Sequence, residues 1–393
     1  MNHVFYYKET KTEYYIIYNP STDKFQFTLK LPKNKTCHEL MNGYEQTKPS
    51  LKHFSIDFWV WCSELKSNKI KSINYAYWKS SNNAVYNTFM SLCSSSWLHH
   101  EPIYYKEYKW ADDCHNGGLT YASVGTFQAY GYDFSGFYPS LLVDPKFQIP
   151  TKEGTESILF ELPTKLKVGY YKIIIQSDDD NFNKIFAYSK KNTYTNYTLA
   201  YAIEKQKQFK ISIKLVQNGK PNCYLYDDTY LQYTHKIFDK WYTTLKQIKQ
   251  VLPQNKLVKH LFSSIGGNLA KKNCIYKTDQ EIKHENLILC WDDSADWIQL
   301  ESHKKPDESE YHTLQSTKQP QKTNMRLYSF LVSIGRNKIG DIGLTNLDGI
   351  LAIQTDGILF SEPMTQTFEG LRIDDSKTGL IDIKHCNSII KLD

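Results

Sequence analysis

The stretch Tyr132-Asp-Phe-Ser-Gly-Phe-Tyr-Pro-Ser140 places an acidic side chain between two kinds of local structure. The pattern predicts that Asp133 ends a strand, that a turn follows, and that Tyr138-Pro-Ser140 opens a helix with Pro139 in its first turn. Backbone N–H groups in such a turn suit a triphosphate, as helix N-termini generally do. The same segment also fits a strand-end aspartate and a proline-capped helix that have only a structural purpose.

A second segment, centred on Lys259, is predicted to form an amphipathic helix. At about 100° per residue, its apolar side chains fall within an arc of roughly 140°: Leu257, Val258, Leu261, Phe262 and Ile265. The other side holds Lys259, Ser263, Gly266 and Gly267. Because each glycine inside a helix costs about 1 kcal/mol relative to alanine, we expect either a ligand close to this face or the end of the helix.

The third segment, Ile353-Gln-Thr-Asp-Gly-Ile358, places Asp356 in a tight turn between two apolar strands. An aspartate in a hairpin turn is commonplace by itself. The order acid, lysine-bearing helix, acid is more specific, because two carboxylates and a facing lysine suit phosphoryl transfer from a nucleoside triphosphate. Two Mg²⁺ ions, with Mn²⁺ as a substitute, would activate a primer hydroxyl and neutralise the leaving pyrophosphate.

The composition sets broad limits on these interpretations. The 393 residues are 40% apolar and 23% charged, with a net charge of +6, which permits binding to a polyanion without requiring it. No stretch is long and apolar enough for a membrane helix, so we expect no membrane partner. The eight cysteines show no zinc-site spacing and fit a reducing, intracellular compartment. Lysine-rich, arginine-poor usage suggests an AT-rich genome, such as that of a virus or linear plasmid.

The periodicity predicts an α+β chain with one helical hairpin between sheet segments. Expected strands include residues 13–18, 24–29, 167–175, 209–215, 349–353 and 357–360. Expected helices are residues 236–250, 255–270, with a break at Pro253 between them, and 325–340. Residues 303–323 are expected to form a polar loop.

In sequence order, the three segments resemble the three polymerase motifs of family B DNA polymerases. Asp133-Phe-Ser-Gly-Phe-Tyr-Pro-Ser-Leu-Leu142 resembles the pattern D-x-x-S-L-Y-P-S, and Lys259-His-Leu-Phe-Ser-Ser-Ile-Gly-Gly267 resembles K-x-x-x-N-S-x-Y-G. Ile353-Gln-Thr-Asp-Gly357 is similar to Y-x-D-T-D-S and matches its second acid. The protein-primed branch is indicated by His115-Asn-Gly-Gly118, which resembles Y-x-G-G, and by Phe238-Asp-Lys-Trp-Tyr-Thr243. The resemblance covers roughly residues 105–390.

The resemblance implies a right-hand polymerase fold whose palm is an antiparallel sheet with packing helices, with helical-hairpin fingers and a β-rich N-terminal region. The implied divisions are a β-rich region at 1–105, palm at 106–154, an insertion that contacts a priming protein at 155–235, fingers at 236–272, and palm with a vestigial thumb at 273–393. Residues 1–132 are too few for a full exonuclease and hold no D-x-E pair; Asp57 stands alone.

The resemblance also assigns roles to individual residues. Asp133 and Asp356 would be the catalytic metal ligands for two Mg²⁺ ions, Lys259 would bind the triphosphate, and Tyr138 would lie beneath the incoming sugar. Further substrate contacts are implied for Ser135, Phe137, Ser263 and Gly266, and DNA contacts for Gly117, Gly118 and Arg336. The implied partners are a DNA primer-template, dNTPs, and a terminal (priming) protein or accessory subunit.

The chain departs from the family pattern at several positions. Gly266 replaces a tyrosine, Ser263 an asparagine, Gln354 the first acid of the third motif, and His115 the tyrosine of Y-x-G-G. We therefore keep three functional hypotheses open: a templated DNA polymerase, a nucleotidyltransferase with relaxed template dependence, and a catalytically silent DNA-binding or scaffolding subunit. A fourth possibility is another α+β nucleotide-binding protein that matches these motifs by chance.

Overall fold

The computed structural model describes residues 3–9, 12–19, 24–28, 37–39, 81–94, 97, 100–251, 256–270, 274–290, 296–304, 310–318 and 323–392. Asp57 and Pro253, both named in the sequence predictions, lie outside these ranges. The chain divides into two units, one made of Met1–Leu98 and Thr234–Asn268, the other of His99–Tyr233 and Leu269–Asp393. None of the helices in the described ranges is both long and apolar enough to cross a membrane.

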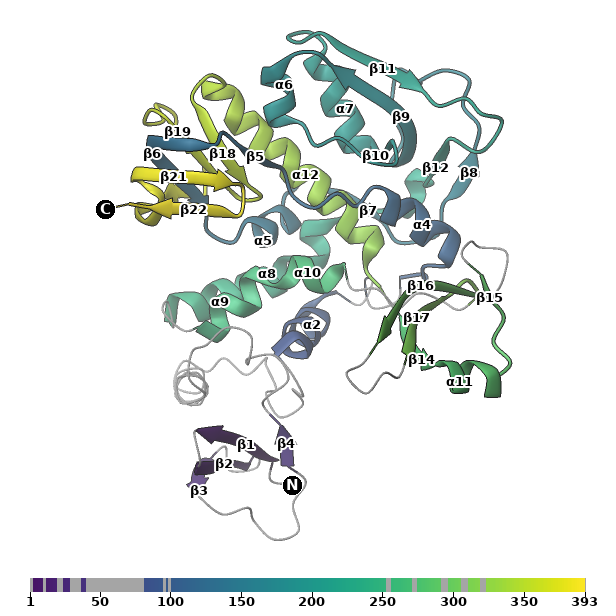
Figure 1. The fold of residues 1–393 in the computed structure, drawn as a ribbon, viewed down its shortest axis with the longest axis vertical. Helices are drawn as coiled ribbons and strands as arrows, with labels where there is room; N and C mark the ends of the chain where they lie inside the picture. The colour runs from purple at the N-terminus through teal and green to yellow at the C-terminus, as the bar shows by residue number, and fades with distance from the viewer. Residues whose placement is uncertain are drawn as a thin grey trace. The chain divides into compact units, whose positions relative to one another are not determined.

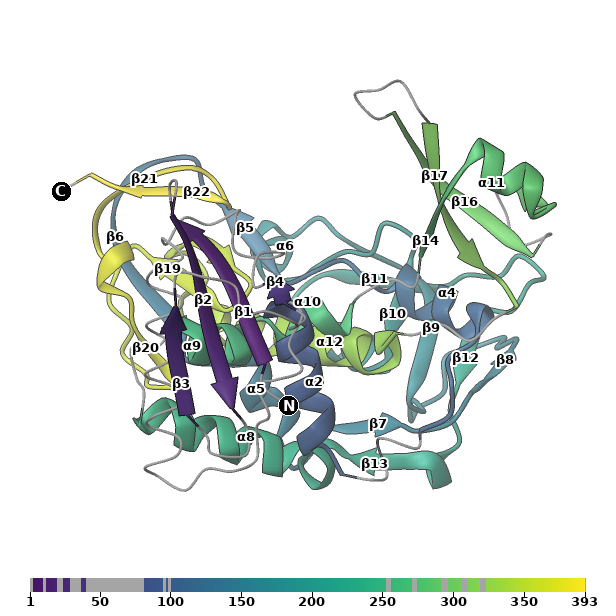
Figure 2. The same cartoon turned by 90° about the horizontal axis from the view of Figure 1, so that it is seen from below.

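The first unit contains a four-stranded sheet in the order β3-β2-β1-β4 (Figure 2). Its strands are β1 (His3–Glu9), β2 (Thr12–Asn19), β3 (Lys24–Thr28) and β4 (Cys37–Glu39). The strands predicted at 13–18 and 24–29 are therefore confirmed. Tyr, Ile and Phe dominate these segments, which suits a pleated sheet.

Helices make up the rest of the described part of the first unit. They are α2 (Ser81–Leu92), α8 (Thr234–Val251), α9 (Lys256–Ser263) and α10 (Ile265–Leu269). An aromatic cluster joins α2 to α8, because the Phe89 ring lies 5.1 Å from that of Phe238 and 5.2 Å from that of Trp241. The expectation of short strands throughout 1–105 was wrong at α2, where Val85, Phe89 and Leu92 are buried at helical spacing.

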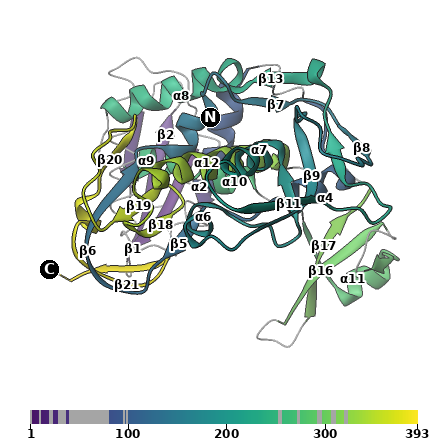
Figure 3. The same ribbon diagram turned by 90° about the horizontal axis from the view of Figure 1, so that it is seen from above.

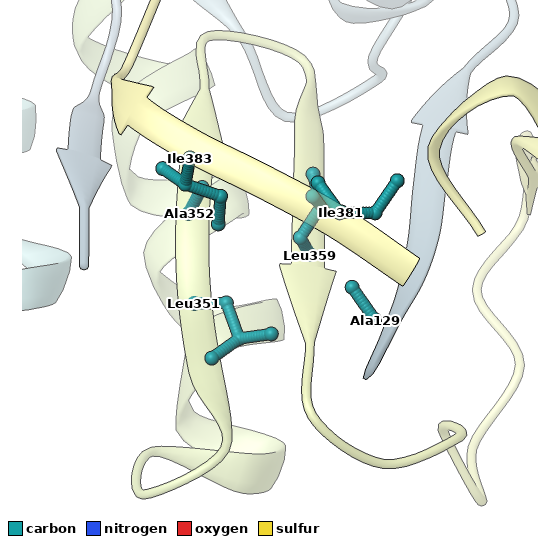
Figure 4. Packing of buried hydrophobic residues seen from close by; sticks show 6 residues of the cluster. All are labelled: Ala129, Leu351, Ala352, Leu359, Ile381 and Ile383. Atoms are coloured by element: carbon teal, nitrogen blue, oxygen red, sulfur yellow. The ribbon is translucent and has the colours of Figure 1, made fainter. Parts of the chain in front are cut away.

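The second unit contains a large antiparallel sheet in the order β22-β21-β6-β19-β18-β5, with β20 also paired to β6. Its strands are β5 (Thr120–Ala122), β6 (Gly125–Phe134), β18 (Ile350–Gln354), β19 (Gly357–Phe360), β20 (Leu371–Ile373), β21 (Gly379–His385) and β22 (Ser388–Lys391). A buried cluster holds the sheet together: Ala129, Leu351, Ala352, Leu359, Ile381 and Ile383 (Figure 4). The strands predicted at 349–353 and 357–360 are confirmed.

Helix α12 (Met325–Gly343) is the long central helix of this unit and confirms the helix predicted at 325–340 (Figure 1). It packs against α4 (Tyr105–Asp113), α5 (Phe137–Leu142) and α7 (Asn196–Lys205). A side chain at Gly335 would lie only 3.0 Å from the Phe137 ring, so glycine lets α5 approach closely.

A smaller sheet is centred on β9 (Gly169–Ser177). It also contains β8 (Thr155–Ser157), β10 (Thr193–Thr195), β11 (Ile211–Leu215) and β12 (Cys223–Leu225), while β7 (Gln148–Pro150) pairs separately with β13 (Leu231–Tyr233). The strands predicted at 167–175 and 209–215 are confirmed. This region also contains two helices that were not predicted, α6 (Asp180–Ile185) and α7, which the side chains of Asp179 and Thr195 cap.

Besides its large sheet and the sheet centred on β9, the second unit contains a third sheet of more than two strands, in the order β14-β17-β16-β15. Its elements are β14 (Ile275–Thr278), α11 (Asp279–His284), β15 (Leu289–Cys290), β16 (Trp297–Lys304) and β17 (Glu310–Ser316). The polar loop predicted at 303–323 was wrong over β17, which pairs with β14 on one side and β16 on the other. This pairing buries the polar side chains of His312, Thr313 and Gln315. Because these residues are polar, the composition of the segment predicted a loop where the structure has a central strand.

Candidate active site

Two acidic residues meet where β6 lies beside the β18–β19 hairpin. Asp133 stands opposite Gly357 in the β6–β19 register, and Asp356 directly precedes Gly357. The backbone N–H of Phe134 donates to the Asp356 carbonyl at 3.0 Å. A side chain at Gly357 would lie 3.3 Å from Asp133 Oδ1, so glycine leaves room for that carboxylate. The order and spacing of the three sequence segments predict that the two acids come from adjacent strands of one antiparallel sheet, and the pairing of β6 with β19 confirms this.

The two carboxylates influence each other electrostatically. Burial, followed by the charge of Asp133, raises the pKa of Asp356 to about 6, while Lys377 acts in the opposite direction. The environment of Asp356 therefore disfavours its negative charge, and a cation beside the two carboxylates would relieve this cost. No group of three or more His, Cys, Asp and Glu residues suited to a metal was found in the described ranges. Two carboxylates nevertheless fit Mg²⁺, which commonly takes one or two protein carboxylates together with water and substrate phosphates.

The pKa of Asp356 predicts how stability depends on pH. Its folded-state value of about 6 exceeds the ordinary 3.8, so between these values the unfolded chain releases a proton that the folded chain retains. Stability should therefore fall as pH rises through this window. In a chelator, the melting temperature of Asp356→Asn minus that of the wild type should increase from pH 4 to pH 7. A difference that does not change with pH would contradict the raised pKa.

The turn that carries Asp356 has strained backbone geometry. Thr355 has a φ of 62°, which is unusual for a β-branched residue, and the Asp356 N–H donates to the Gln354 carbonyl at 2.6 Å. The Thr355 N–H donates to the Leu119 carbonyl at 2.9 Å. The segment His115–Leu119 thus supports the turn from the neighbouring strand end. Strained turns of this kind persist where the surrounding structure holds them in place.

Gly118 and Arg336 form the outer part of this support. A side chain at Gly118 would lie 2.5 Å from the Thr355 methyl carbon, so only glycine fits without displacing the turn. Arg336 is only 5% exposed, and its Nε donates to the Gly117 carbonyl at 2.7 Å. From its buried position Arg336 therefore supports the segment that holds the turn, while the DNA contact at this residue stays a prediction. Gly118 supports the same turn, because it lies directly against Thr355.

Gly118→Ala is expected to lower nucleotide incorporation about tenfold while changing the melting temperature little, because the added methyl pushes Thr355 and moves the Asp356 carboxylate. Steady-state rates of the variant and of Gly219→Ala should be compared. Gly219 has a φ of 76°, so alanine there strains the backbone, but a side chain there would meet no atom within 4 Å. Equal losses in both variants would show that the effect is general backbone strain.

The helix start after Asp133 is held by backbone contacts. Gly136 adopts a φ of 73° and precedes α5, while the Ser135 N–H donates to the Gly370 carbonyl at 3.1 Å. Phe137 is 2% exposed and its side chain packs in the core; the substrate contact at this residue stays a prediction. Tyr138 is partly buried, and burial raises the pKa of its hydroxyl above the usual range. Pro139 lies in the first turn of α5, as predicted.

The helix predicted around Lys259 lies in the first unit. Lys259 and Ser263 are exposed, and Leu261, Phe262 and Ile265 are buried, which confirms the amphipathic pattern for these residues. The helical segment is interrupted at Ser264 and continues as α10 through both glycines. Gly266 is buried, whereas Gly267 is exposed, so the expectation of an exposed glycine pair was half wrong. The placement of Lys259 opposite the two acids stays a prediction.

Comparison with solved structures identifies the fold. The chain matches Phi29 DNA polymerase complexed with primer-template DNA with a TM-score of 0.52 and 10% identity, covering 86% of this chain and 57% of that one. It matches the same polymerase complexed with single-stranded DNA with a TM-score of 0.50 and 10% identity, covering 78% and 51%. The fold resembles that of a DNA polymerase. The mixed α/β architecture with antiparallel sheets is shared, and the chain spans about half the length of these structures. No protein-family model and no curated protein sequence matches the chain.

Within this polymerase-like fold, the sequence prediction missed Lys377. Its ammonium group lies about 4 Å from the position that a side chain at Gly357 would take, and its charge lowers the pKa of Asp356. It also lies 3.7 Å from Asp374 Oδ2. Lys377 comes 21 residues after Asp356 in a polar segment, and only the pairing of β20 and β21 with β6 brings it to the acids. The only local sign of this role in the sequence is that a new strand, β21, begins shortly after the lysine.

Proposed function

We propose that the chain is a DNA polymerase of the protein-primed family B type, which adds dNTPs to a primer 3′ end or to a priming-protein hydroxyl. The adjacent placement of Asp133 and Asp356, where β6 pairs with β19, carries the proposal. A polymerase-like fold with 10% identity to Phi29 DNA polymerase supports it. The three sequence segments follow the order of the family's polymerase motifs, and they supply the residues proposed to bind the metal ions and the triphosphate.

The proposed roles follow from the chemistry of the residues. Asp133 and Asp356 would hold two Mg²⁺ ions, with Mn²⁺ as a substitute, and these ions supply activation of the attacking hydroxyl and charge neutralisation of the leaving group. The charge of Lys377 opposes the rise in the pKa of Asp356. Lys259 would bind the triphosphate, and Tyr138 would lie beneath the incoming sugar. In this scheme the large antiparallel sheet is the palm, and α8 to α10 form the fingers.

Primer extension tests the proposal. A labelled primer, with and without template, is incubated with each dNTP in Mg²⁺ or Mn²⁺. We expect addition of the nucleotide that the template specifies. A folded chain that binds primer-template but adds no nucleotide in either metal would favour the silent scaffolding hypothesis. Shortening of a mismatched primer without dNTPs would contradict the expected lack of a nuclease.

A second candidate is a nucleotidyltransferase with relaxed template dependence. It is favoured by glycine at position 266, where the family pattern has a tyrosine next to the nascent base pair. The same experiment distinguishes the two, because this enzyme would extend the primer equally well when the template is omitted. A priming protein docked on residues 155–235 is the partner proposed for the first candidate.

A further inference from the structure

A hydrogen-bonded Ser–His–Asp chain lies in the third sheet, outside the proposed active site. Ser302 on β16 stands opposite His312 on β17, and Ser302 Oγ lies 2.9 Å from His312 Nδ1. The other ring nitrogen, Nε2, lies 2.8 Å from Asp279 Oδ1. Gln299 Nε2 lies 2.6 Å from Ser302 Oγ and 3.0 Å from His312 Nδ1. His312 is 8% exposed, whereas Ser302 is open to solvent.

Local structure places these four side chains together. The β16–β17 register shifts between Gln299 and Glu301, so Gln299 and Ser302 face the same side of the sheet despite their odd spacing. Asp279 is the first residue of α11, directly after the N-cap residue Thr278 of a capping box. In that box the Thr278 N–H donates to Glu281 Oε2 at 2.7 Å, which fixes the start of the helix.

The donors and acceptors define where the protons lie. A carboxylate can only accept, so Asp279 requires the proton on His312 Nε2 and leaves Nδ1 with a lone pair. The Ser302 hydroxyl can then donate to Nδ1 while its oxygen accepts from the Gln299 amide. A hydroxyl whose proton faces a base, with that base oriented by a third group, is the arrangement of an activated nucleophile. Gln299 would stabilise the charge that develops on Oγ.

The position of this sheet limits which active site Ser302 can reach. In three views, the β14–β17 sheet and the sheet that carries Asp133 and Asp356 lie at opposite ends of the second unit (Figures 1, 2 and 3). Ser302 therefore cannot serve the acids of its own chain, but its exposed hydroxyl can enter the active site of another copy. The proposed function supplies the matching electrophile there, which is the α-phosphorus of a bound dNTP.

We propose that Ser302 is a nucleotide acceptor that reacts in trans, an inference that rests on the proposed function. Ser302 Oγ attacks the α-phosphorus of a dNTP held by a second copy, and an Oγ–P bond forms. The bond from the α-phosphorus to the bridging oxygen breaks, pyrophosphate leaves, and the serine proton moves to His312 Nδ1 and then to solvent. The product is a chain esterified with one nucleotide, whose 3′-hydroxyl can be extended.

A mixing experiment with two variants of different size tests this. Asp356→Asn keeps Ser302 but lacks a metal ligand, and Ser302→Ala keeps the acids but lacks the acceptor. With α-labelled dNTP and Mn²⁺, we expect label on the Asp356→Asn chain only when Ser302→Ala is present, and none on either variant alone. Label on the Ser302→Ala chain would overturn the assignment of Ser302. Label on wild type but not on the mixture would overturn the reaction in trans.

Controls separate this inference from the proposed function. Ser302→Ala should extend a DNA primer at the wild-type rate; if it does so but the mixture stays unlabelled, the acceptor role is wrong and the polymerase proposal stands. If no variant extends DNA, both proposals fail. Ser361→Ala removes an exposed serine elsewhere and should label like wild type.

The relay itself is tested by substitution of its members. Ser302→Thr, which retains a hydroxyl, should recover labelling. Asp279→Asn should label at least about tenfold more slowly, with unchanged DNA-primed extension, and Asp279→Glu should restore part of the rate. Wild-type labelling by Asp279→Asn would show that the aspartate only supports α11 and would overturn the activated-nucleophile assignment.

Discussion

Asp356→Asn is expected to reduce nucleotide incorporation by at least about 10²–10³-fold while leaving the fold intact. Loss of an essential metal ligand should remove at least about 3–4 kcal/mol of transition-state stabilisation, comparable to loss of one preorganised oxyanion donor. Asparagine has nearly the same size, and the turn is held by the backbone contacts of Thr355 and Phe134. One negative charge is therefore removed without a loss of packing.

The comparison requires a matched control for a lost surface charge. Asp348→Asn removes an exposed carboxylate from the loop before β18 and should incorporate nucleotides like wild type. Folding is checked by circular dichroism, and rates are measured in Mg²⁺ and in Mn²⁺. Equal incorporation by wild type and Asp356→Asn would identify Asp356 as a turn residue and remove the main support for the polymerase proposal.

Local patterns were sufficient to predict most elements around the acids. The apolar runs on both sides of Thr355 and Asp356 predicted the β18–β19 hairpin, because such a short loop leaves only one way to pair the strands. Pro139 marked the start of α5. The pairing of β6 with β19 followed from the order of three chemical segments, since no single segment was specific.

Long-range pairing accounts for what the sequence did not reveal. Lys377 reaches the acids only because β20 and β21 flank β6, and nothing near it in sequence indicates that neighbour. Arg336 matched a family position, but its burial against the Gly117 carbonyl depends on how α12 crosses the sheet. The Ser302–His312 pair depends on β17, for which the polar composition predicted a loop.

Gln354 shows how a motif comparison can mislead. The sequence presents it as the replacement of an acid, which suggests that aspartate there would restore the family pattern. In the structure its amide Nε2 donates to the Cys386 carbonyl, which joins β18 to the turn between β21 and β22. Aspartate cannot donate this bond, and it would add a third carboxylate near a pair that already repels. The glutamine therefore has a structural purpose of its own.

Glu107→Ala is expected to lower the free energy of unfolding by about 3–5 kcal/mol, because it leaves a buried arginine without its counter-ion. Glu107 and Arg326 are both 0% exposed, and Arg326 Nη2 donates to Glu107 Oε2 at 2.6 Å. The Tyr226 hydroxyl also donates to this carboxylate, at 2.7 Å. Burial opposes the charge on Arg326, but its hydrogen bonds to Glu107 raise its pKa above the usual value. The measurement is the midpoint of urea denaturation.

A variant that removes the whole polar group distinguishes a lost charge pair from a lost contact. Glu107→Leu combined with Arg326→Met and Tyr226→Phe replaces the three side chains with apolar groups of similar size, so no buried polar atom of the triad is left unpaired. The Glu101 carbonyl, which accepts from Arg326 Nη1 at 3.1 Å, loses this donor. We expect the triple variant to recover most of the stability that Glu107→Ala loses. If Glu107→Ala alone lowers the free energy of unfolding by less than about 1 kcal/mol, water must reach the Glu107–Arg326 pair.

The same pair also supports the active-site turn, because α4 leads into the Gly117–Gly118 segment and α12 carries Arg336. Glu107→Ala should therefore loosen the Thr355 turn, and nucleotide incorporation should fall at temperatures well below the unfolding midpoint. The apolar triple variant should keep its activity.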